Sequence, residues 1–208
     1  MRNWHPTEKQ VRPPREKAAI AASGPMFFPL RRRRSSPNRA LIARLCTESV
    51  AAVRRPAFYL DYGVPDTFEG RFELLALHAG LVLRRFNRAE APGPAVAQEL
   101  VDGVFANLEA DLREAGVGDV TVPKRMKTLA EAFLGRSAAY DAALRRCDDT
   151  LTAVVSRNVY AGRLDPAGAQ AARMTRYVEL TAERLDASPL AECLAGPLPF
   201  PDPLSVTV

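Results

Sequence analysis

Residues 56–86, which read PAFYLDYGVPDTFEGRFELLALHAGLVLRRF, decide the fold of this chain. They place a compact aromatic turn directly before a long amphipathic helix. Gly63, Pro65 and Asp66 are typical of a turn. Asp66 followed by Glu69 is typical of a capping box, in which two side chains satisfy free backbone N–H groups at a helix start. The stretch therefore predicts a well-defined helix behind a rigid corner.

Helical periodicity continues on both sides of this stretch. Proline and glycine residues separate the periodic segments and mark helix ends. The predicted helices cover residues 38–55, 67–88, 95–115, 123–146, 148–160 and 166–186. The second has an expected buried stripe of Phe68, Phe72, Leu75, Ala79, Val82 and Phe86. The sequence thus predicts an all-α fold, a single domain of about six helices over residues 38–187.

We expect both ends of the chain to lie outside this domain. Residues 1–37 are rich in Arg and Pro and lack sustained periodicity, which predicts a basic, largely disordered leader. Met26 within it offers an alternative start codon. Residues 188–208 contain Pro189, Pro197, Pro199, Pro201 and Pro203. This composition predicts a Pro-rich tail that is extended or disordered.

The net charge of +5 is unevenly distributed. Residues 1–39 contain ten Lys or Arg and two Glu, whereas residues 40–208 contain 19 basic and 22 acidic residues. The predicted domain is therefore mildly acidic. Because nucleic-acid-binding domains usually carry a basic patch on the fold itself, we expect no DNA partner.

Cysteine usage favours a reducing cytosol or organelle matrix, and hydropathy predicts a soluble or peripheral protein. Cys46, Cys147 and Cys193 are odd in number and far apart, with no CxxC pair or zinc-ligand spacing, which favours a reducing compartment. No apolar run approaches the roughly 18 residues needed to cross a bilayer. We therefore expect a soluble cytoplasmic protein, or one peripheral on the inner membrane.

No residue pattern indicates an enzyme. Glu69 and Glu73 share one helix face at i,i+4, but His78 lies five residues beyond Glu73 and points elsewhere. The chain also lacks a Gly-rich phosphate loop, a GxSxG motif and a Cys–His pair with local context. We expect no catalytic site, cofactor or metal, and interpret Glu69 and Glu73 as a solvated helix face.

His78 adjoins the predicted buried stripe, three residues after Leu75 and four before Val82. Three interpretations are open. The side chain is partly buried and hydrogen-bonded within the bundle, or it contacts a partner segment or a haem-bearing client, or it ligates a metal.

Two groups of cations lie at predicted helix ends. Those between residues 84 and 88 lie at a helix C-terminus, where the macrodipole favours positive charge. Lys124, Arg125 and Lys127 lie in a first turn, where the dipole opposes them by a few tenths of a kcal/mol each. Solvated charge and an edge that binds an acidic partner both fit the second group.

The leader carries a further basic segment. Its apolar residues Phe27 and Phe28 precede four adjacent cations, Arg31, Arg32, Arg33 and Arg34. Such a segment can attach to an anionic membrane surface, where each Arg contributes about 1 kcal/mol. It can equally bind ribosomal RNA through counterion release, or act only as a solubilising tail.

Three segments, in order and at normal spacing, resemble one known family. They are YLDYGVPDTFEGRFELLALHAGLVLRRF, QELVDGVFANLEADLREAGVGDVTVPKRMKTLAEAFLGRSAAYDAAL and AVVSRNVYAG. They are similar to the ubiquinol–cytochrome c chaperone family, over about residues 38–165. That family includes bacterial proteins and the mitochondrial assembly factor for cytochrome b of the respiratory bc1 complex, and the bacterial members look closest.

The resemblance implies a helical chaperone without catalytic activity. The mitochondrial relatives act with a small partner protein near the ribosomal exit tunnel and hold newly made cytochrome b. The positions that match the family motifs are the expected partner- or client-binding residues, and Arg125 is added to them because it lies in the basic first turn. The set is Pro65, Thr67, Phe68, Phe72, His78, Lys124, Arg125, Lys127, Arg136, Tyr140, Arg157 and Asn158. Around the histidine the mitochondrial members are more aromatic, where this chain has Ala79 and Gly80.

Two functional hypotheses follow. In the first, the chain is an assembly chaperone for the bc1 complex that binds newly made cytochrome b or a small helper protein. Its contact face then surrounds residues 65–78 with an edge at 124–140, while residues 26–34 locate it at the membrane or ribosome. In the second, it is a general helical interaction module associated with ribosome, RNA or membrane surface.

Overall fold

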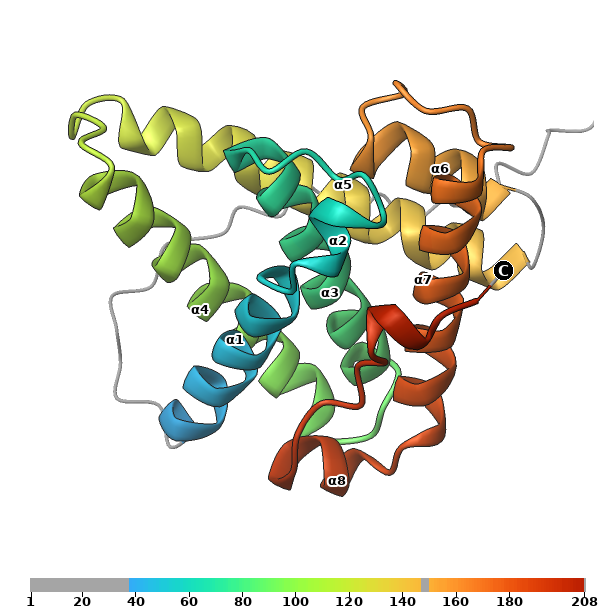
Figure 1. Cartoon of the computed structure of the whole chain (residues 1–208). Helices are drawn as coiled ribbons and strands as arrows, with labels where there is room; N and C mark the ends of the chain where they lie inside the picture. The colour runs from blue at the N-terminus through green and yellow to red at the C-terminus, as the bar shows by residue number, and fades with distance from the viewer. Residues whose placement is uncertain (1–37, 147–149, 208) are drawn as a thin grey trace, which may run out of the picture. The chain divides into compact units, whose positions relative to one another are not determined.

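The computed structural model describes residues 38–146 and 150–207, in which every regular element is a helix (Figure 1). The elements are α1 Arg39–Val53, α2 Ala57–Leu60, α3 Phe68–Asn87, α4 Gly93–Glu114, α5 Val122–Arg146, α6 Thr150–Val159, α7 Ala169–Ala187, α8 Leu190–Ala195 and a 3-10 turn, η1, Pro203–Ser205. The six predicted helices correspond to α1 and α3–α7, so the all-α prediction is confirmed. The short α2, α8 and η1 were not predicted.

Some predictions fall on residues that the structure does not describe. The basic leader at 1–37, with Phe27, Phe28 and Arg31–Arg34, lies outside the described residues, and so does Cys147. Cys46 and Cys193 are buried free thiols. None of the described helices is long and apolar enough to cross a membrane.

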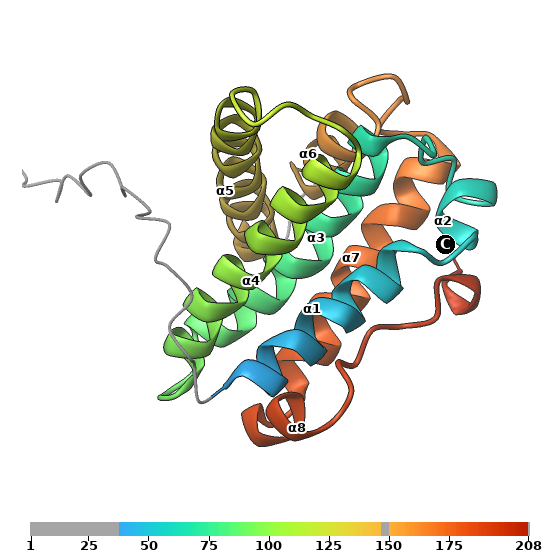
Figure 2. The ribbon, with the colours of Figure 1, turned by 90° about the vertical axis from the view of Figure 1, so that its left-hand side faces the viewer.

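Helix α3 is the centre of the fold. Helices α1, α4, α5, α6 and α7 all pack against it (Figures 1 and 2). Thirteen of its 20 residues are buried, on nearly all sides of the helix. The predicted single stripe was therefore too narrow, because Leu74, Ala76, Leu77 and Leu81 are also fully or almost fully buried. A helical stretch that is apolar on all sides belongs in an interior, and residues 74–83 of α3, apolar except for His78, follow that rule.

Small residues on α3 let neighbouring helices approach closely. Ala76, Ala79 and Gly80 are all buried. A Cβ atom added at Gly80 would lie 2.9 Å from Ser137 Oγ on α5, closer than such atoms normally approach. The short side chains at these positions are therefore what allows α5 to pack directly on the central helix.

The cations at the C-terminal end of α3 fasten it to two other helices. Arg84 bonds Asp186 Oδ2 at 2.7 Å, Arg85 donates to the carbonyls of Leu185 and Ser188 at 2.8 and 3.0 Å, and Arg88 bonds Asp141 Oδ1 at 2.7 Å. Their partners lie on α5 and at the end of α7. The sequence indicated only a favourable interaction of these cations with the helix dipole, whereas in the structure they also join α3 to α5 and α7.

The C-terminal segment after residue 188 differs from the predicted tail. Parts of it are extended, as expected, but it also forms α8 and η1 and packs against the helices. Its buried residues include Cys193, Leu198, Pro201, Pro203 and Val206. Apolar side chains spaced between the prolines give this segment a surface to bury, so it is part of the helical body.

Polar contacts hold this segment in place. The Arg44 guanidinium donates to the carbonyls of Cys193, Leu194 and Gly196, which are free C=O groups at the end of α8. Glu48 accepts from Leu198 N at 2.7 Å. Further along, the Tyr62 hydroxyl donates to the Pro203 carbonyl at 2.7 Å, and the Arg173 guanidinium lies 4.6 Å from the Tyr62 ring centroid.

Replacing Arg44 with Ala is expected to loosen the C-terminal segment. Hydrogen bonds to a charged donor contribute about 1.5–3 kcal/mol in mutational series, and this side chain is partly exposed, so we expect a loss of about 1–2 kcal/mol in the free energy of unfolding. The measurement is urea denaturation together with hydrogen exchange of the Leu198 amide, which should speed up. The control is Arg54→Ala, at an exposed position. Equal effects of the two substitutions would contradict the capping role.

Candidate partner-binding surface

The turn before α3 is built as the sequence indicated, with one correction. Gly63 has a positive φ of 69°, and Thr67 rather than Asp66 is the N-cap. The Thr67 hydroxyl accepts from Gly70 N at 3.2 Å, while Asp66 pairs with Arg71 at 2.7 Å. The capping box with Glu69 was wrong because the helix begins one residue later than that motif requires.

Close backbone contact makes Gly70 essential to this corner. A Cβ atom there would lie 2.0 Å from the Pro65 carbonyl oxygen, which no side chain tolerates. The corner therefore folds back tightly on the first turn of α3. Thr67 and Phe68 face solvent on it, and Phe68 is 45% exposed although it was predicted to be buried.

Phe72 and His78 lie beneath the surface. Phe72 is 6% exposed and His78 is not exposed at all. Direct contact of either side chain with a partner would need the helices to separate. Of the three interpretations of His78, the structure supports hydrogen bonding within the bundle.

The surroundings of His78 set its tautomer. Its Nδ1 lies 2.7 Å from the Leu74 carbonyl oxygen, which can only accept, so Nδ1 carries the proton. Its Nε2 lies 2.9 Å from the Tyr177 hydroxyl and therefore accepts from it. Rings of Phe58, Tyr177 and Phe200 surround the imidazole at centroid distances of 5.5, 5.6 and 5.1 Å. Burial among these rings lowers the pKa of His78 to about 4, so the side chain is neutral at pH 7.

The lowered pKa of His78 predicts a pH-dependent stability. The unfolded chain binds a proton at His78 below about pH 6.5, whereas the folded chain does so only near pH 4. The contribution of the neutral histidine is thus complete above pH 6.5 and is lost as the pH falls toward 4. This loss is about 3 kcal/mol.

Urea denaturation at pH 7, 6, 5 and 4 measures this effect against His78→Gln, which cannot titrate in that range. The wild type should lose stability more steeply with falling pH than the variant. Parallel pH profiles would contradict the assignment. NMR titration of the wild-type imidazole gives a second readout that needs no substitution, since the His78 resonances should stay constant from pH 7 to pH 5.

A buried ion pair joins α3 to α5 and corrects a prediction. Glu73 was expected to be solvated, but it is 8% exposed and bonds the Arg136 guanidinium. Arg136 also lies above the Phe72 ring, 5.9 Å from its centroid. Burial raises the pKa of the Glu73 carboxyl, while Arg136 beside it acts in the opposite direction. Glu69, by contrast, is exposed as predicted.

Tyr140 and Asn158 belong to the same interior junction between α3, α5 and α6. Tyr140 is 1% exposed, and burial raises the pKa of its phenol. The Asn158 side chain beside the phenol acts in the opposite direction to burial on this pKa. Arg136, Tyr140 and Asn158 therefore shape the helix junction more than they present a surface.

The remaining predicted residues do lie at the surface. Lys124 and Arg125 are exposed in the first turn of α5, Lys127 is exposed in its second turn, and Arg157 is exposed on α6. Lys127 is 3.9 Å from Glu131, whereas Lys124 and Arg125 have no ion pair within the described part of the chain. The predicted set thus divides into a corner with half-buried Pro65 and exposed Thr67 and Phe68, an exposed basic end of α5, the exposed Arg157 of α6, and an interior group.

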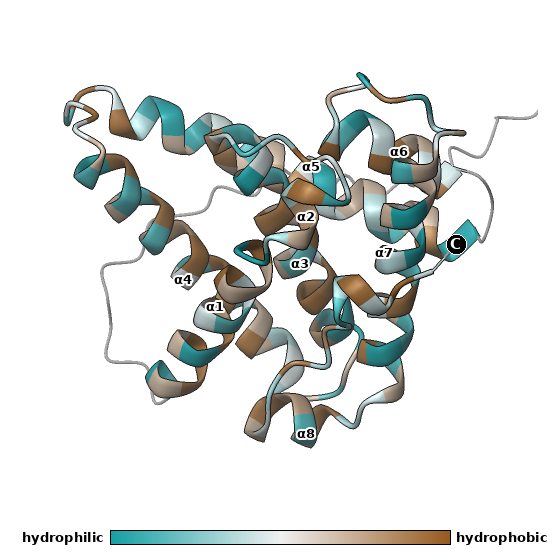
Figure 3. Ribbon diagram, viewed as in Figure 1, coloured by the Kyte–Doolittle hydropathy of each residue, from teal (hydrophilic) through white to brown (hydrophobic). Residues whose placement is uncertain are grey.

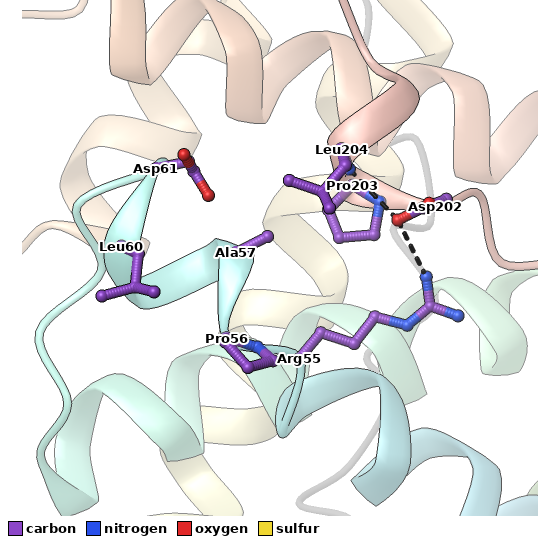
Figure 4. Close-up of a pocket in the computed structure, with 8 residues that line it drawn as sticks. All are labelled: Arg55, Pro56, Ala57, Leu60, Asp61, Asp202, Pro203 and Leu204. Carbon is purple, nitrogen blue, oxygen red and sulfur yellow. Dashed lines mark hydrogen bonds and ion pairs between the residues drawn. The ribbon is translucent and has the colours of Figure 1, made fainter.

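A shallow groove between α2 and η1 was missed by the sequence analysis (Figure 4). It has a volume of about 520 Å³ and is lined by Arg55, Pro56, Ala57, Leu60, Asp61, Asp202, Pro203 and Leu204. Leu60 and Leu204 are 81% and 62% exposed beside it. No local signal could reveal it, because three of its eight lining residues come from the segment expected to lie outside the domain.

The described residues contain no group of three or more His, Cys, Asp or Glu side chains that could hold a metal ion. The two buried thiols are also poor nucleophiles where they lie. Burial raises the pKa of Cys46 to about 11 and raises that of Cys193. The arrangement offers surfaces for binding.

Comparison with known proteins identifies the relatives of this structure. The family model described as "Ubiquinol-cytochrome C chaperone" matches residues 60–200, which is more than half of the chain. The chain belongs to the ubiquinol-cytochrome C chaperone family. The match includes the corner before α3, the whole of α5 and most of the C-terminal segment.

A solved structure and two curated proteins are similar to this family member. The structure, titled as that of the Cbp3 homolog from Brucella abortus, is 37% identical, covers 82% of this chain and 93% of its own, and has a TM-score of 0.73. The "Ubiquinol-cytochrome c reductase complex assembly factor 1" of Drosophila melanogaster is 25% identical over 74% of this chain, and that of Xenopus laevis 24% identical over 56%. The matches span 62% and 58% of those relatives.

Proposed function

We propose that this protein is an assembly chaperone for the ubiquinol–cytochrome c reductase (bc1) complex and that it binds newly made cytochrome b. The observation that carries the proposal is the family match over residues 60–200. The names of the Drosophila and Xenopus relatives, both assembly factors of that complex, point the same way. The function is binding, without a chemical step.

Two exposed regions support a binding role. The corner at Thr67–Phe68 presents an aromatic side chain on a rigid helix start, and the basic end of α5 presents Lys124 and Arg125 without intramolecular ion pairs. Exposed aromatic residues on rigid elements are favourable anchors for a partner, since they bury large area with little loss of conformational entropy.

Deleting the gene in its host and measuring the bc1 complex tests the proposal. We expect a fall in both cytochrome b content and ubiquinol–cytochrome c reductase activity, restored by the wild-type gene. Normal values of both in the deletion strain would overturn it. Affinity capture of the protein during translation distinguishes this proposal from a general helical interaction module. Enrichment of messages that encode cytochrome b supports the proposal. Binding to ribosomes regardless of their message supports the general module.

Phe68→Asp is expected to weaken client binding while the fold persists. Loss of a central aromatic anchor costs about 2 kcal/mol, equivalent to about thirtyfold in affinity. The new carboxylate lies in the first turn of α3, where the dipole favours it by about 0.3–1 kcal/mol. The measurement is rescue of reductase activity in the deletion strain, with thermal unfolding of the purified variant. Leu204→Asp is the control, because Leu204 is also exposed and apolar but lies on η1. Full rescue by Phe68→Asp would remove this corner from the client surface.

The leader is proposed to locate the chaperone at the inner membrane or the ribosome. Phe27, Phe28 and Arg31–Arg34 would supply the apolar anchors and the charge. Replacing the four Arg with Ser should shift the protein from the membrane or ribosome fraction to the supernatant at physiological salt, because each Arg contributes about 1 kcal/mol at an anionic surface. The charge-matched control replaces Arg2, Arg12, Arg15 and Lys17 with Ser. An unchanged distribution in sucrose-gradient fractionation would contradict this role.

A further inference from the structure

The outer face of α5 is the least covered helical surface of the central cluster. We define it by residues that recur every three or four positions: Lys124, Thr128, Glu131, Gly135, Ala138, Ala142 and Arg146. All are exposed except Ala142, which is half-buried. Only five of the 25 residues of α5 are buried, against 13 of 20 in α3. The side chains on this face are therefore open to solvent over most of the helix length.

Gly135 has no role within the described structure that explains it. It lies inside α5 with ordinary helical backbone, and a Cβ atom added there would meet nothing within 4 Å. A glycine inside an exposed helix disfavours the helix relative to alanine, since it adds backbone freedom to the unfolded chain. Ala138 and Ala142 add two further small side chains along the same face. Small side chains of this kind allow the backbone of a second helix to approach closely.

Charge distinguishes this helix from the remainder of the chain. Helix α5 contains six basic and two acidic residues, whereas the other residues of 38–208 contain 14 basic and 20 acidic. Two of the cations, Lys124 and Arg125, lie in the first turn, where the helix dipole opposes them, and Lys127 follows in the next turn. Figure 3 shows hydrophilic residues along the part of α5 near its junction with α4. Glu131 lies 3.9 Å from Lys127, whereas Lys124 and Arg125 have no ion pair within the described residues, so negative charge from another molecule would compensate these two cations.

We propose that the outer face of α5 binds an amphipathic helix of a partner protein, with acidic residues of that helix against Lys124, Arg125 and Lys127 and small residues against Gly135 and Ala138. The inference concerns a different surface from the Phe68 corner and does not depend on which client the chaperone holds. Leu134, 37% exposed, borders the small-residue centre and supplies apolar area.

Other occupants fit this face less well. A lipid surface would require large apolar side chains beside the cations, and Leu134 is the large one at the centre, with Glu131 directly on the face. Single-stranded RNA would require aromatic side chains for stacking, and the face has none. A helix with acidic and small residues matches both the charge at one end and the flat centre.

Site-specific photo-crosslinking in the native host tests the proposal with the full chain. p-Benzoylphenylalanine is placed at Ala138, on the face, and at Ala153, an exposed control position on α6. Mass spectrometry identifies the crosslinked segment. We expect a segment of another protein with acidic and small residues at helical spacing, obtained at Ala138 and not at Ala153.

Charge reversal provides the second arm. Lys124→Glu/Arg125→Glu/Lys127→Glu should lower the crosslink yield at Ala138 by about tenfold or more. The charge-matched control Arg54→Glu/Arg163→Glu/Arg184→Glu should leave it unchanged. Gly135→Leu should also lower the yield while the thermal midpoint stays at or above that of the wild type, because leucine favours helix. That combination separates a docking role of Gly135 from a structural one.

Four results would overturn the proposal: no crosslink above the Ala153 control, crosslinks to lipid or RNA, crosslinks to a second copy of this chain, or equal yields from the two charge-reversed variants. None of them bears on bc1 content. A deletion strain with a normal bc1 complex would contradict the proposed function but would not contradict the proposal for the outer face of α5.

Discussion

Burying α3 on nearly all sides is the constraint on which the described helices depend. Five helices contact this one, so its surface must be apolar and small enough to admit them all. Within the described helix α3 the His78 imidazole is a polar side chain with no exposed surface, and both of its nitrogens are satisfied, by Leu74 and Tyr177. Leaving either nitrogen without a partner would cost about 1–3 kcal/mol. His78 therefore couples α3 to α7 through a bond that only the packed arrangement can satisfy.

The C-terminal segment closes the same aromatic cluster. Phe200 meets the edge of the His78 ring, while Tyr62 bonds the Pro203 carbonyl and stacks under Arg173. The segment thus contributes to the low dielectric that lowers the pKa of His78. Because Arg44 and Glu48 of α1 fix the same segment upstream, both termini of the helical body are tied to one core.

Periodicity was enough to predict the six long helices, because each has apolar residues at helical spacing between proline or glycine boundaries. It was not enough to predict which faces meet. Glu73 looked solvated because its partner, Arg136, is 63 residues away, and Phe68 looked buried because periodicity alone cannot tell where the neighbouring helices end. The C-terminal segment was misjudged for a similar reason. Proline content predicts extended backbone, but burial depends on the apolar residues between the prolines and on a receiving surface that lies more than 100 positions away.

The division of the resemblance-based residues into buried and exposed groups changes how substitutions at them should be interpreted. Phe72, His78 and Tyr140 lie inside helix junctions, so replacing them alters stability first and any partner contact only through it. Thr67, Phe68, Lys124 and Arg125 lie outside, where most substitutions change stability by about 0.5 kcal/mol or less. A functional defect at an exposed position with unchanged stability therefore reports a contact. The same defect at a buried position indicates a loss of stability. A decrease of a few kcal/mol in the free energy of unfolding lowers the amount of folded protein in a marginally stable domain before any binding surface is altered.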